Sequence, residues 1–363
     1  MVKSLTSQLA KISSFDVGGM GAEGLDIPYY IPSSILGLNA LITADIYKGF
    51  PATLITQISG PPGCGKTRIA VDAAQNCQAI GGEVFWIDTE RAMTQEGLMS
   101  DKLDPERMFV GVCNVAEEVT IELRNMLGAV KKMRDGGDNT PLLVVVDSIG
   151  NLMSMLEVSQ IEGGEIKADP GRRAQAIKQI FRASITPVLA AKVVMIVINH
   201  EYTAIGEGKF AANKQSGGHG TVYLSSITIS MTKAQEKEDT LIVGANMKMQ
   251  TTKNRLARER QKMNARLFFD TGFNPYVGLL PYAIEAGAIV KKDKKFIVPH
   301  IDAKKTFWEK SLYREEVFTP ELLKEIAPVV TKFFAYGSEE ISSAAVEMEQ
   351  EALETEVLGD EDN

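Results

Sequence analysis

The sequence is poor in cysteine and has no long hydrophobic run. Three cysteines, Cys64, Cys77 and Cys113, occur among its 363 residues, an odd number at spacings that fit neither a disulfide framework nor a zinc site. No run of about eighteen apolar residues is present, and the first residues, MVKSLTSQLAKISSF, lack the apolar centre of a secretion signal. These absences favour a protein of the reducing cytoplasm, without a membrane partner, over a secreted or membrane protein.

Basic residues are absent from the C-terminal end. Residues 338–363 hold ten acidic and no basic side chains, and the whole chain has a net charge of −8. The remaining residues carry 39 basic and 37 acidic side chains, so the body of the protein is close to neutral. The overall acidity therefore does not exclude a nucleic-acid partner, and we expect an acidic tail that is partly disordered.

A glycine-rich stretch, GPPGCGKT at 60–67, fits the phosphate-binding pattern G-x-x-x-x-G-K-[ST]. Glycines let the backbone curl so that successive N–H groups point at a phosphate, and the next helix adds the partial positive charge of its N-terminus. Lys66 would reach the β- and γ-phosphates, and the Thr67 hydroxyl would hold Mg²⁺. The candidate nucleotide-binding residues are Gly60, Pro61, Pro62, Gly63, Cys64, Gly65, Lys66, Thr67 and Arg68.

The stretches around this motif have the expected context. Residues 53–59 are rich in β-branched side chains, and residues 66–80 carry apolar side chains at helical spacing. Further apolar runs at 83–88, 107–112, 141–147 and 192–199 alternate with helical patterns. Continuous runs of this kind are typical of strands buried on both faces of a parallel sheet, so we expect an α/β fold.

The rest of the chain divides into smaller parts. From Gly220 onward the pattern predicts strands without long helices, and we expect them to extend the sheet as antiparallel strands. The capped helix that begins at Thr319 belongs to a small α+β subdomain. An apolar stripe at the start of the chain predicts a short helix, which docks either on its own domain or on a neighbouring copy. The predicted division is 1–34 for the N-terminal helix and linker, 35–275 for the nucleotide-binding core, 276–337 for the subdomain and 338–363 for the tail.

Acidic side chains end two of the apolar runs. LLVVVD ends in Asp147, which is typical of the residue that holds the water shell of a magnesium ion beside a bound nucleotide. FWIDTE ends in Glu90, which would orient and deprotonate an attacking water if its strand lies next to that of the phosphate loop. Such a base favours an ATP hydrolase over a small-molecule kinase. The alternative is that Asp88 or Glu90 caps a following helix.

A third apolar run, VINHEY, carries Asn199 and His200 at its end, where a polar side chain can contact the γ-phosphate. The glycine-rich segment 201–220 is long enough to be a functional loop. It and a second basic segment, 157–182, contain cations and aromatic rings suited to phosphates and stacked bases. The candidates for such contacts with phosphates and bases are Lys167, Arg172, Arg173, Lys178, Tyr202, Lys209, Phe210 and Lys214. A solvated charged surface is the alternative for either segment taken alone.

Seven motifs together resemble the RecA family of DNA strand-exchange proteins. In chain order they are GPPGCGKT, FWIDTE, LLVVVDSIGNL, IEGGEIKADPGRRAQAI, VINHEYT, SGGHGTVY and TKNRLARER. The stretches LDPERMF, FRASITPVLAAK and NPYVGLLPYAIEAG are similar to those of the bacteriophage UvsX recombinases. The resemblance covers residues 35–292 and implies a RecA-like P-loop ATPase core with a mostly parallel central sheet.

The resemblance also implies an activity and its partners. RecA-like proteins wind as helical filaments on single-stranded DNA, with ATP sandwiched between protomers, and exchange strands with homologous double-stranded DNA. Hydrolysis of ATP with Mg²⁺ would then loosen the grip on DNA. A recombination mediator and a single-strand-binding protein are the further partners, and a phage protein of this kind would act in the cytoplasm of a bacterial host.

By the same resemblance, individual residues acquire roles. Glu90 matches the catalytic glutamate, and His200 stands where the family senses the γ-phosphate. Lys253 and Arg255 match cations that reach across the interface to the ATP of a neighbouring protomer. The two DNA-binding loops of the family correspond to residues 157–174 and to 201–220, which include Gly217 and Gly218.

The sequence departs from bacterial RecA in two places. Gly97 stands where an aromatic residue stacks on adenine, so the contact with the base is unassigned. A larger basic C-terminal region is also missing, which leaves VKKDKK at 290–295 as a weak candidate for a second DNA site. A RecA-like ring helicase and an ATP-gated DNA-coating protein are the alternative functions.

Overall fold

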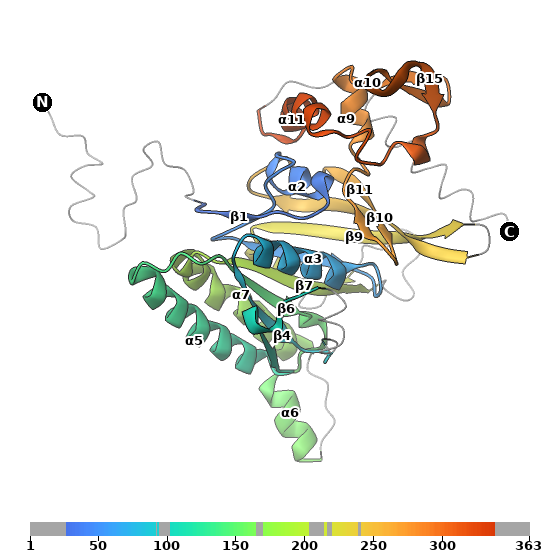
Figure 1. Ribbon diagram of the computed structural model, residues 1–363. Coiled ribbons are helices and arrows are strands. Elements are labelled where there is room, and N and C mark those ends of the chain that lie inside the picture. Colours follow the sequence, from blue (N-terminus) through green and yellow to red (C-terminus); the bar gives the residue numbers. More distant parts are fainter. Residues whose placement is uncertain are drawn as a thin grey trace, which may run out of the picture.

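The computed structural model describes residues 27–91, 93, 102–164, 170–202, 214–215, 220–238 and 241–337. Some predictions therefore lie outside the described residues: the helix at the start of the chain, Gly97, Lys167, Lys209, Phe210, Gly217, Gly218 and the acidic tail. Figure 1 shows a broad central sheet with helices on both faces and a small C-terminal subdomain beside one end of it.

Among the described residues, the central sheet has ten strands. They are β3 (Ile55–Gly60), β4 (Glu83–Asp88), β5 (Met108–Val112), β6 (Leu142–Asp147), β7 (Val194–Tyr202), β8 (Lys214–Gln215), β9 (Ile227–Glu238), β10 (Leu241–Asn254), β11 (Lys262–Phe268) and β12 (Gly272–Asn274). Across the sheet the order is β12, β11, β10, β9, β3, β7, β6, β4 and β5, and β8 pairs with β7 outside this path. Neighbours from β9 to β5 along this order run parallel, which confirms the α/β class.

The main helices cover the two faces of the parallel strands. They are α3 (Lys66–Ala79), α5 (Ala116–Asp135) and α7 (Pro170–Ala191). In Figure 1, α5 and α7 lie together on one face and α3 lies on the other. Successive residues of β6 enter two different cores, because side chains alternate along a strand: Val145 clusters with Ile69 of α3, and Val144 with Leu123 of α5 and Phe181 of α7. This two-sided burial explains the continuous apolar runs in the sequence.

One apolar run differs from that expectation. Residues 107–112 were expected to form a strand buried on both faces, but β5 is the edge strand of the sheet. Phe109 is 57% exposed and Val112 56% exposed. Phe109 stacks on Phe85 of β4, with ring centroids 4.9 Å apart, so its ring is covered on one side only.

The strands after Gly220 extend the sheet, with one correction. β10 pairs antiparallel with β9, and β11 with β10, as expected, but β9 runs parallel to β3. Residues expected as the start of that strand form the short helix α8 (Gly220–Leu224) instead. The chain thereby returns to the end of the sheet where β3 begins before β9 starts, and this return makes the pairing parallel.

Shorter elements complete the described chain. They are β1 (Tyr30–Ile31), α2 (Leu36–Thr43), β2 (Phe50–Pro51), η1 (Pro105–Arg107), η2 (Ile149–Asn151), α6 (Met155–Glu162), α9 (Leu280–Glu285), β13 (Val290–Lys292), β14 (Lys295–Val298), α10 (Pro299–Asp302), β15 (Ala303–Phe307), η3 (Glu309–Ser311) and α11 (Pro320–Phe334). The Thr319 side chain accepts a hydrogen bond from Leu322 N, so the predicted cap of the last helix is confirmed. Within the described part of the chain, no helix combines the length and the apolar character needed to cross a membrane.

Candidate active site

The phosphate loop joins β3 to α3, as the motif predicted. Gly63 and Gly65 have φ angles of 69° and 92°, in the left-handed region that favours glycine. The Lys66 ammonium folds back over the loop and donates to the carbonyl oxygens of Gly60 and Pro61, both at 2.8 Å. Lys66 is buried, and burial lowers the pKa of its side chain. The loop therefore forms with its lysine stored against its own backbone.

The candidate metal ligands lie together. Thr67, at the start of α3, donates from its hydroxyl to Asp147 Oδ2 at 2.9 Å, and Asp147 is the last residue of β6. Burial raises the pKa of Asp147 to about 6; the nearby charges of Glu90 and Asp88 also raise it, and the Thr67 hydrogen bond opposes them. A hydroxyl and a carboxylate oxygen are donors that a hard cation prefers.

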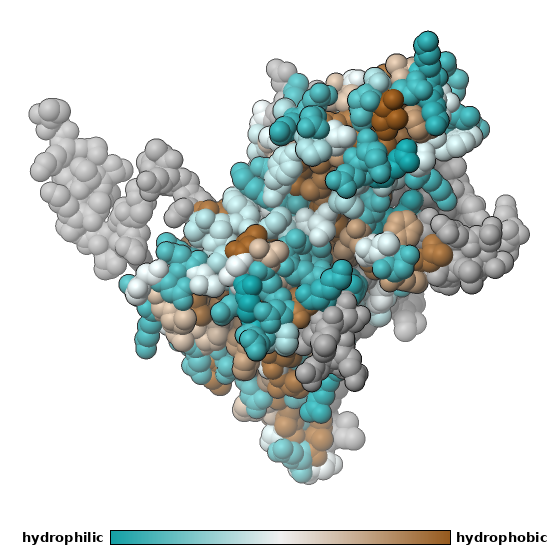
Figure 2. All heavy atoms as spheres, in the orientation of Figure 1, coloured by the Kyte–Doolittle hydropathy of each residue, from teal (hydrophilic) through white to brown (hydrophobic). Residues whose placement is uncertain are grey.

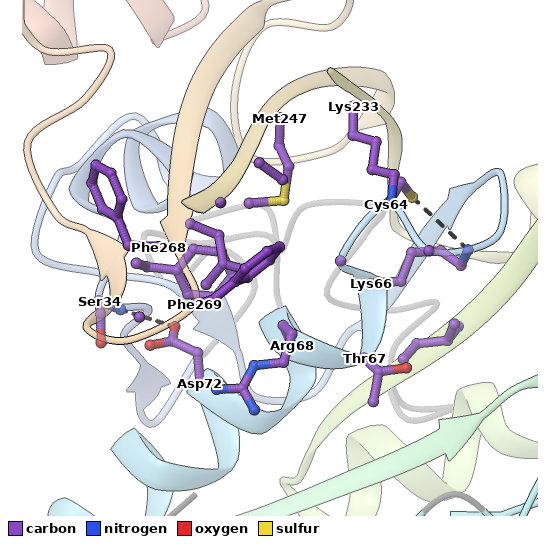
Figure 3. A pocket seen from close by; sticks show the side chains of 18 of the residues that line it. Ser34, Cys64, Lys66, Thr67, Arg68, Asp72, Lys233, Met247, Phe268 and Phe269 are labelled. Atoms are coloured by element: carbon purple, nitrogen blue, oxygen red, sulfur yellow. Dashed lines mark hydrogen bonds between the residues drawn. The ribbon is translucent and has the colours of Figure 1, made fainter. Parts of the chain in front are cut away.

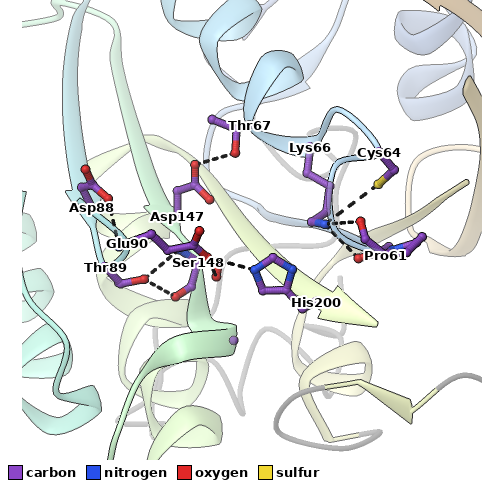
Figure 4. A network of polar contacts seen from close by, with 12 residues as sticks. Pro61, Cys64, Lys66, Thr67, Asp88, Thr89, Glu90, Asp147, Ser148 and His200 are labelled. Carbon is purple, nitrogen blue, oxygen red and sulfur yellow. Dashed lines mark hydrogen bonds and ion pairs between the residues drawn. The ribbon is translucent and has the colours of Figure 1, made fainter. Parts of the chain in front are cut away.

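Glu90 follows the end of β4 and points its carboxylate at two hydrogen-bond donors. Ser148 Oγ donates to Glu90 Oε1 at 2.8 Å, and His200 Nε2 lies 2.9 Å from the same oxygen (Figure 4). Burial disfavours the charged form of Glu90. The hydrogen bonds from His200 and Ser148 and the charges of His200 and Lys66 outweigh burial, and the pKa of Glu90 is lowered.

Asp88, two residues earlier, has a different role. Its Oδ1 accepts from Glu90 N at 3.0 Å and its Oδ2 from Met93 N at 2.8 Å. The sequence did not decide between the two acids, and their contacts distinguish them. Asp88 accepts hydrogen bonds from the backbone after β4, and the Glu90 side chain lines the cleft.

His200 reaches Glu90 from β7, the strand beside β3. It is paired with Gly60 of the phosphate loop in the parallel register. The sequence predicted that the strand ends at His200. Instead it continues to Tyr202, where β8 pairs with it. A Cβ built on Gly150 would overlap the His200 ring, so the imidazole rests directly on the Gly150 backbone.

Glu201 is a buried acid that the sequence analysis missed. Its Oε1 accepts hydrogen bonds from Ser59 Oγ at 2.6 Å and Ser230 Oγ at 3.0 Å. The two serines belong to β3 and β9, so Glu201 ties β7 to both across the base of the phosphate loop. No sequence motif had marked Glu201 as a functional or structural residue.

These groups share one cleft of about 1280 Å³. The phosphate loop, Glu90, Asp147 and His200 form one wall. The sequence did not predict the other wall, to which β9 to β12 contribute Lys233, Met247, Phe268 and Phe269, labelled in Figure 3. Phe269 is 67% exposed and lines the cleft, so its ring is accessible to a bound molecule. The FF pair at the end of the run 265–270 was the signal available in the sequence.

Comparison with known proteins decides the family of this site. The RecA N-terminal domain family matches residues 9–274. The chain belongs to the RecA family. It is 28% identical over 262 residues to the Recombination and repair protein of Enterobacteria phage T4, covering 72% of this chain and 64% of that protein. It is 26% identical over 331 residues to Protein RecA of Thermus aquaticus, covering 90% of each. The resemblance inferred from the motifs is thus confirmed, although the chain spans slightly less than two thirds of the phage protein.

The two cations matched to RecA-family interface residues do not line the cleft of their own chain. Lys253, near the end of β10, donates to the carbonyl oxygens of Val222, Tyr223 and Ser225 at 3.2, 2.6 and 2.6 Å. These carbonyls lie at the C-terminal end of α8, where a cation is favoured. Burial, with the charge of Arg255, lowers the pKa of Lys253. Arg255 itself is exposed.

The segments matched to RecA-family DNA loops are only partly loops. Within 157–174, matched to the first loop, residues 157–162 belong to α6 and residues 170–174 to the start of α7. Arg172 is exposed, Arg173 donates to the Gly150 carbonyl oxygen, and the Lys178 side chain lies against Gly220. In the second segment, the register places Tyr202 opposite Lys214.

Proposed function

We propose that this RecA-family protein is an ATP-dependent recombinase that forms filaments on single-stranded DNA and exchanges strands with a homologous duplex. The carrying observation is the Glu90 carboxylate, held by Ser148 and His200 in the same cleft as the phosphate loop and the Thr67–Asp147 pair. A protein that only bound a nucleotide would need no such base. The relatives named as recombination and RecA proteins support the DNA-directed part of the proposal.

Thr67 and Asp147 are the residues that would hold Mg²⁺. Their oxygens lie 2.9 Å apart, and the raised pKa of Asp147 fits a carboxylate that a cation would stabilise. The described residues contain no cluster of three or more acidic, His or Cys ligands, so the remaining ligands would be phosphate oxygens and water, as is usual for this ion. Bound Mg²⁺ would neutralise charge on the β- and γ-phosphates of ATP.

Each side chain of this network would have a role in hydrolysis. Lys66 exchanges the Gly60 and Pro61 carbonyls for the phosphates, which have a higher negative charge. Glu90 is ionised at neutral pH because its pKa is lowered, so it can accept the proton of the attacking water. His200, hydrogen bonded to Glu90 and continuous with the segment 201–220, couples the γ-phosphate to that segment.

The assembled interface would complete the site. Lys253 and Arg255 of one protomer close over the ATP of the next, and Lys253 must leave the α8 carbonyls to do so. Because only the triphosphate makes these cross-interface contacts, ATP favours the filament and hydrolysis loosens it.

Helix α6 forms the lower end of the molecule and has exposed apolar side chains. Met155, Leu156 and Ile161 are each at least 40% exposed, and this end shows as a brown patch in Figure 2.

DNA would bind along the segments 157–174 and 201–220, with Arg172 as an exposed cation on the first. Contacts of this kind are made to phosphates and base faces, so weak sequence preference and strong salt dependence are expected. Pairing between the strands then reads the sequence. A recombination mediator and a single-strand-binding protein are further partners in this proposal.

The first test is ATP hydrolysis with and without single-stranded DNA, in wild type and Glu90→Gln. We expect DNA to stimulate wild type, and the substitution to reduce the rate by about 10²- to 10⁴-fold while nucleotide binding is retained. Glu83→Gln is the matched control, because Glu83 begins the same strand and is exposed. Absence of DNA stimulation in wild type would reject the recombinase.

A second assay separates the recombinase from its alternatives. Formation of a D-loop between a single strand and a homologous duplex is expected with ATP. Duplex unwinding without homology would instead identify a ring helicase. DNA-stimulated hydrolysis without either product would identify a DNA-coating protein.

A further inference from the structure

Arg173 lies near the start of α7, within the segment 157–174 that is proposed to bind DNA. Its guanidinium donates to the carbonyl oxygen of Gly150. The side chain of a residue predicted to contact DNA is thus engaged with the protein itself. A hydrogen bond from a charged donor is about twice as strong as a neutral one, so it holds that carbonyl in place.

Gly150 belongs to a four-residue stretch, 147–150, in which Asp147, Ser148 and Gly150 contact groups of the active site. Asp147 accepts from Thr67, and Ser148 donates to Glu90. Gly150 supports the His200 ring, and the absence of a Cβ is what allows the ring to lie there. Anything that moves Gly150 therefore moves the imidazole that is hydrogen bonded to Glu90.

The same helix reaches the second DNA segment. The Lys178 side chain lies against Gly220, where residues 201–219 end and α8 begins. One helix, α7, is thus in contact with the ends of both segments and with the backbone under His200. This placement gives α7 a path to the catalytic carboxylate that involves no DNA contact by Arg173.

We infer that Arg173 is a positioning residue that aligns His200 and Glu90 through Gly150 and transmits occupation of the first DNA segment to ATP hydrolysis. The inference rests on the proposed function. It differs from the simpler reading in which Arg173 binds a DNA phosphate. In that reading, its removal weakens DNA binding and reduces the salt dependence; in ours, its removal uncouples hydrolysis from binding.

The test measures DNA affinity over a salt series and ATP turnover at saturating DNA for Arg173→Ala, Arg173→Lys and wild type. We expect Arg173→Ala to bind single-stranded DNA within about twofold of wild type with an unchanged salt slope. Its DNA-stimulated kcat should fall at least about tenfold while KM for ATP is unchanged, as for a lost transition-state alignment. Arg173→Lys, which keeps a charged donor, should recover part of the rate. Arg124→Ala, an exposed arginine on α5, is the control.

Gly150→Ala tests the contact between Gly150 and His200, and Arg173→Lys provides the readout for Arg173 should Arg173→Ala not fold. The added methyl group must displace the His200 ring, so kcat should fall without loss of DNA affinity. A lower DNA affinity and a smaller salt slope in Arg173→Ala, with normal kcat at saturating DNA, would overturn the inference. Wild type without DNA stimulation would instead remove the proposed function itself, so the two failures are distinguishable.

Discussion

Two regions of this molecule carry the groups of one proposed reaction, and they differ in how complete they are. At the carboxyl ends of the parallel strands, Thr67 is hydrogen bonded to Asp147, and Ser148 and His200 are hydrogen bonded to Glu90. At the end of β10, Lys253 is bonded to α8 and lies away from the cleft. The first region is assembled within one chain. In the proposed function, the second would act only on the ATP of a neighbouring chain, so assembly would be a condition for hydrolysis.

Among the further variants that test this comparison, the largest effect is expected at the interface. Lys253→Ala should reduce DNA-stimulated hydrolysis by on the order of 10³-fold, as for loss of a cation supplied in trans, while nucleotide binding by the free chain is retained. Turnover and nucleotide titrations measure the two quantities. Lys262→Ala, on the neighbouring strand β11, is the control.

Mixing the variants tests the division directly. Lys253→Ala and Glu90→Gln protomers should each hydrolyse ATP slowly alone, but in mixed filaments some interfaces would join an intact Glu90 to an intact Lys253. Recovery of hydrolysis on mixing is expected. If mixing restores nothing although both variants form filaments, Lys253 acts within its own chain, and the contrast between the regions is wrong.

The pH dependence of folding stability tests the first region, which contains Asp147. The pKa of Asp147 is raised to about 6 in the folded chain, above about 3.9 in an unfolded one. The folded state therefore binds the proton more tightly, and stability should decrease as pH rises from about 4 to 6, by up to about 3 kcal/mol. Asp147→Asn should remove this dependence. Urea unfolding of both proteins over this range without nucleotide measures it.

The affinity for Mg²⁺ should have the opposite pH dependence and increase as the pH rises. A protonated Asp147 is a poor ligand, so the affinity for Mg²⁺ with nucleotide should fall by up to about tenfold per pH unit below pH 6. Titrations at several pH values check this. A flat profile would mean that another group holds the ion.

The smallest effect is expected for the acidic tail. A chain ending at Gly337 lacks ten acidic side chains that would compete with DNA for basic surface. Its DNA affinity should rise severalfold at low salt, with a lower requirement for Mg²⁺, and its rate of hydrolysis at saturating DNA should not change. Unchanged affinity in a filter-binding or anisotropy assay would leave the tail as a solubilising segment.

Local patterns explain what could be predicted. Strands buried on both faces need continuous apolar runs, and the phosphate loop needs glycines at fixed spacing, so both were visible in sequence. The parallel pairing of β9 with β3 was not visible, because apolar runs do not state their direction or partner. The edge position of β5 was missed for the same reason: its composition matches that of the central strands.

The sequence by itself determined the fold class, the phosphate loop and the acids at the end of β6 and after β4, because each depends on residues close together in the chain. Only the tertiary structure decided which distant residues meet. It brought His200 to Glu90, Glu201 to Ser59, and Arg173 to Gly150, across separations of up to 142 residues. Such contacts depend on strand order and on the packing of α7 against the sheet, which no local pattern encodes.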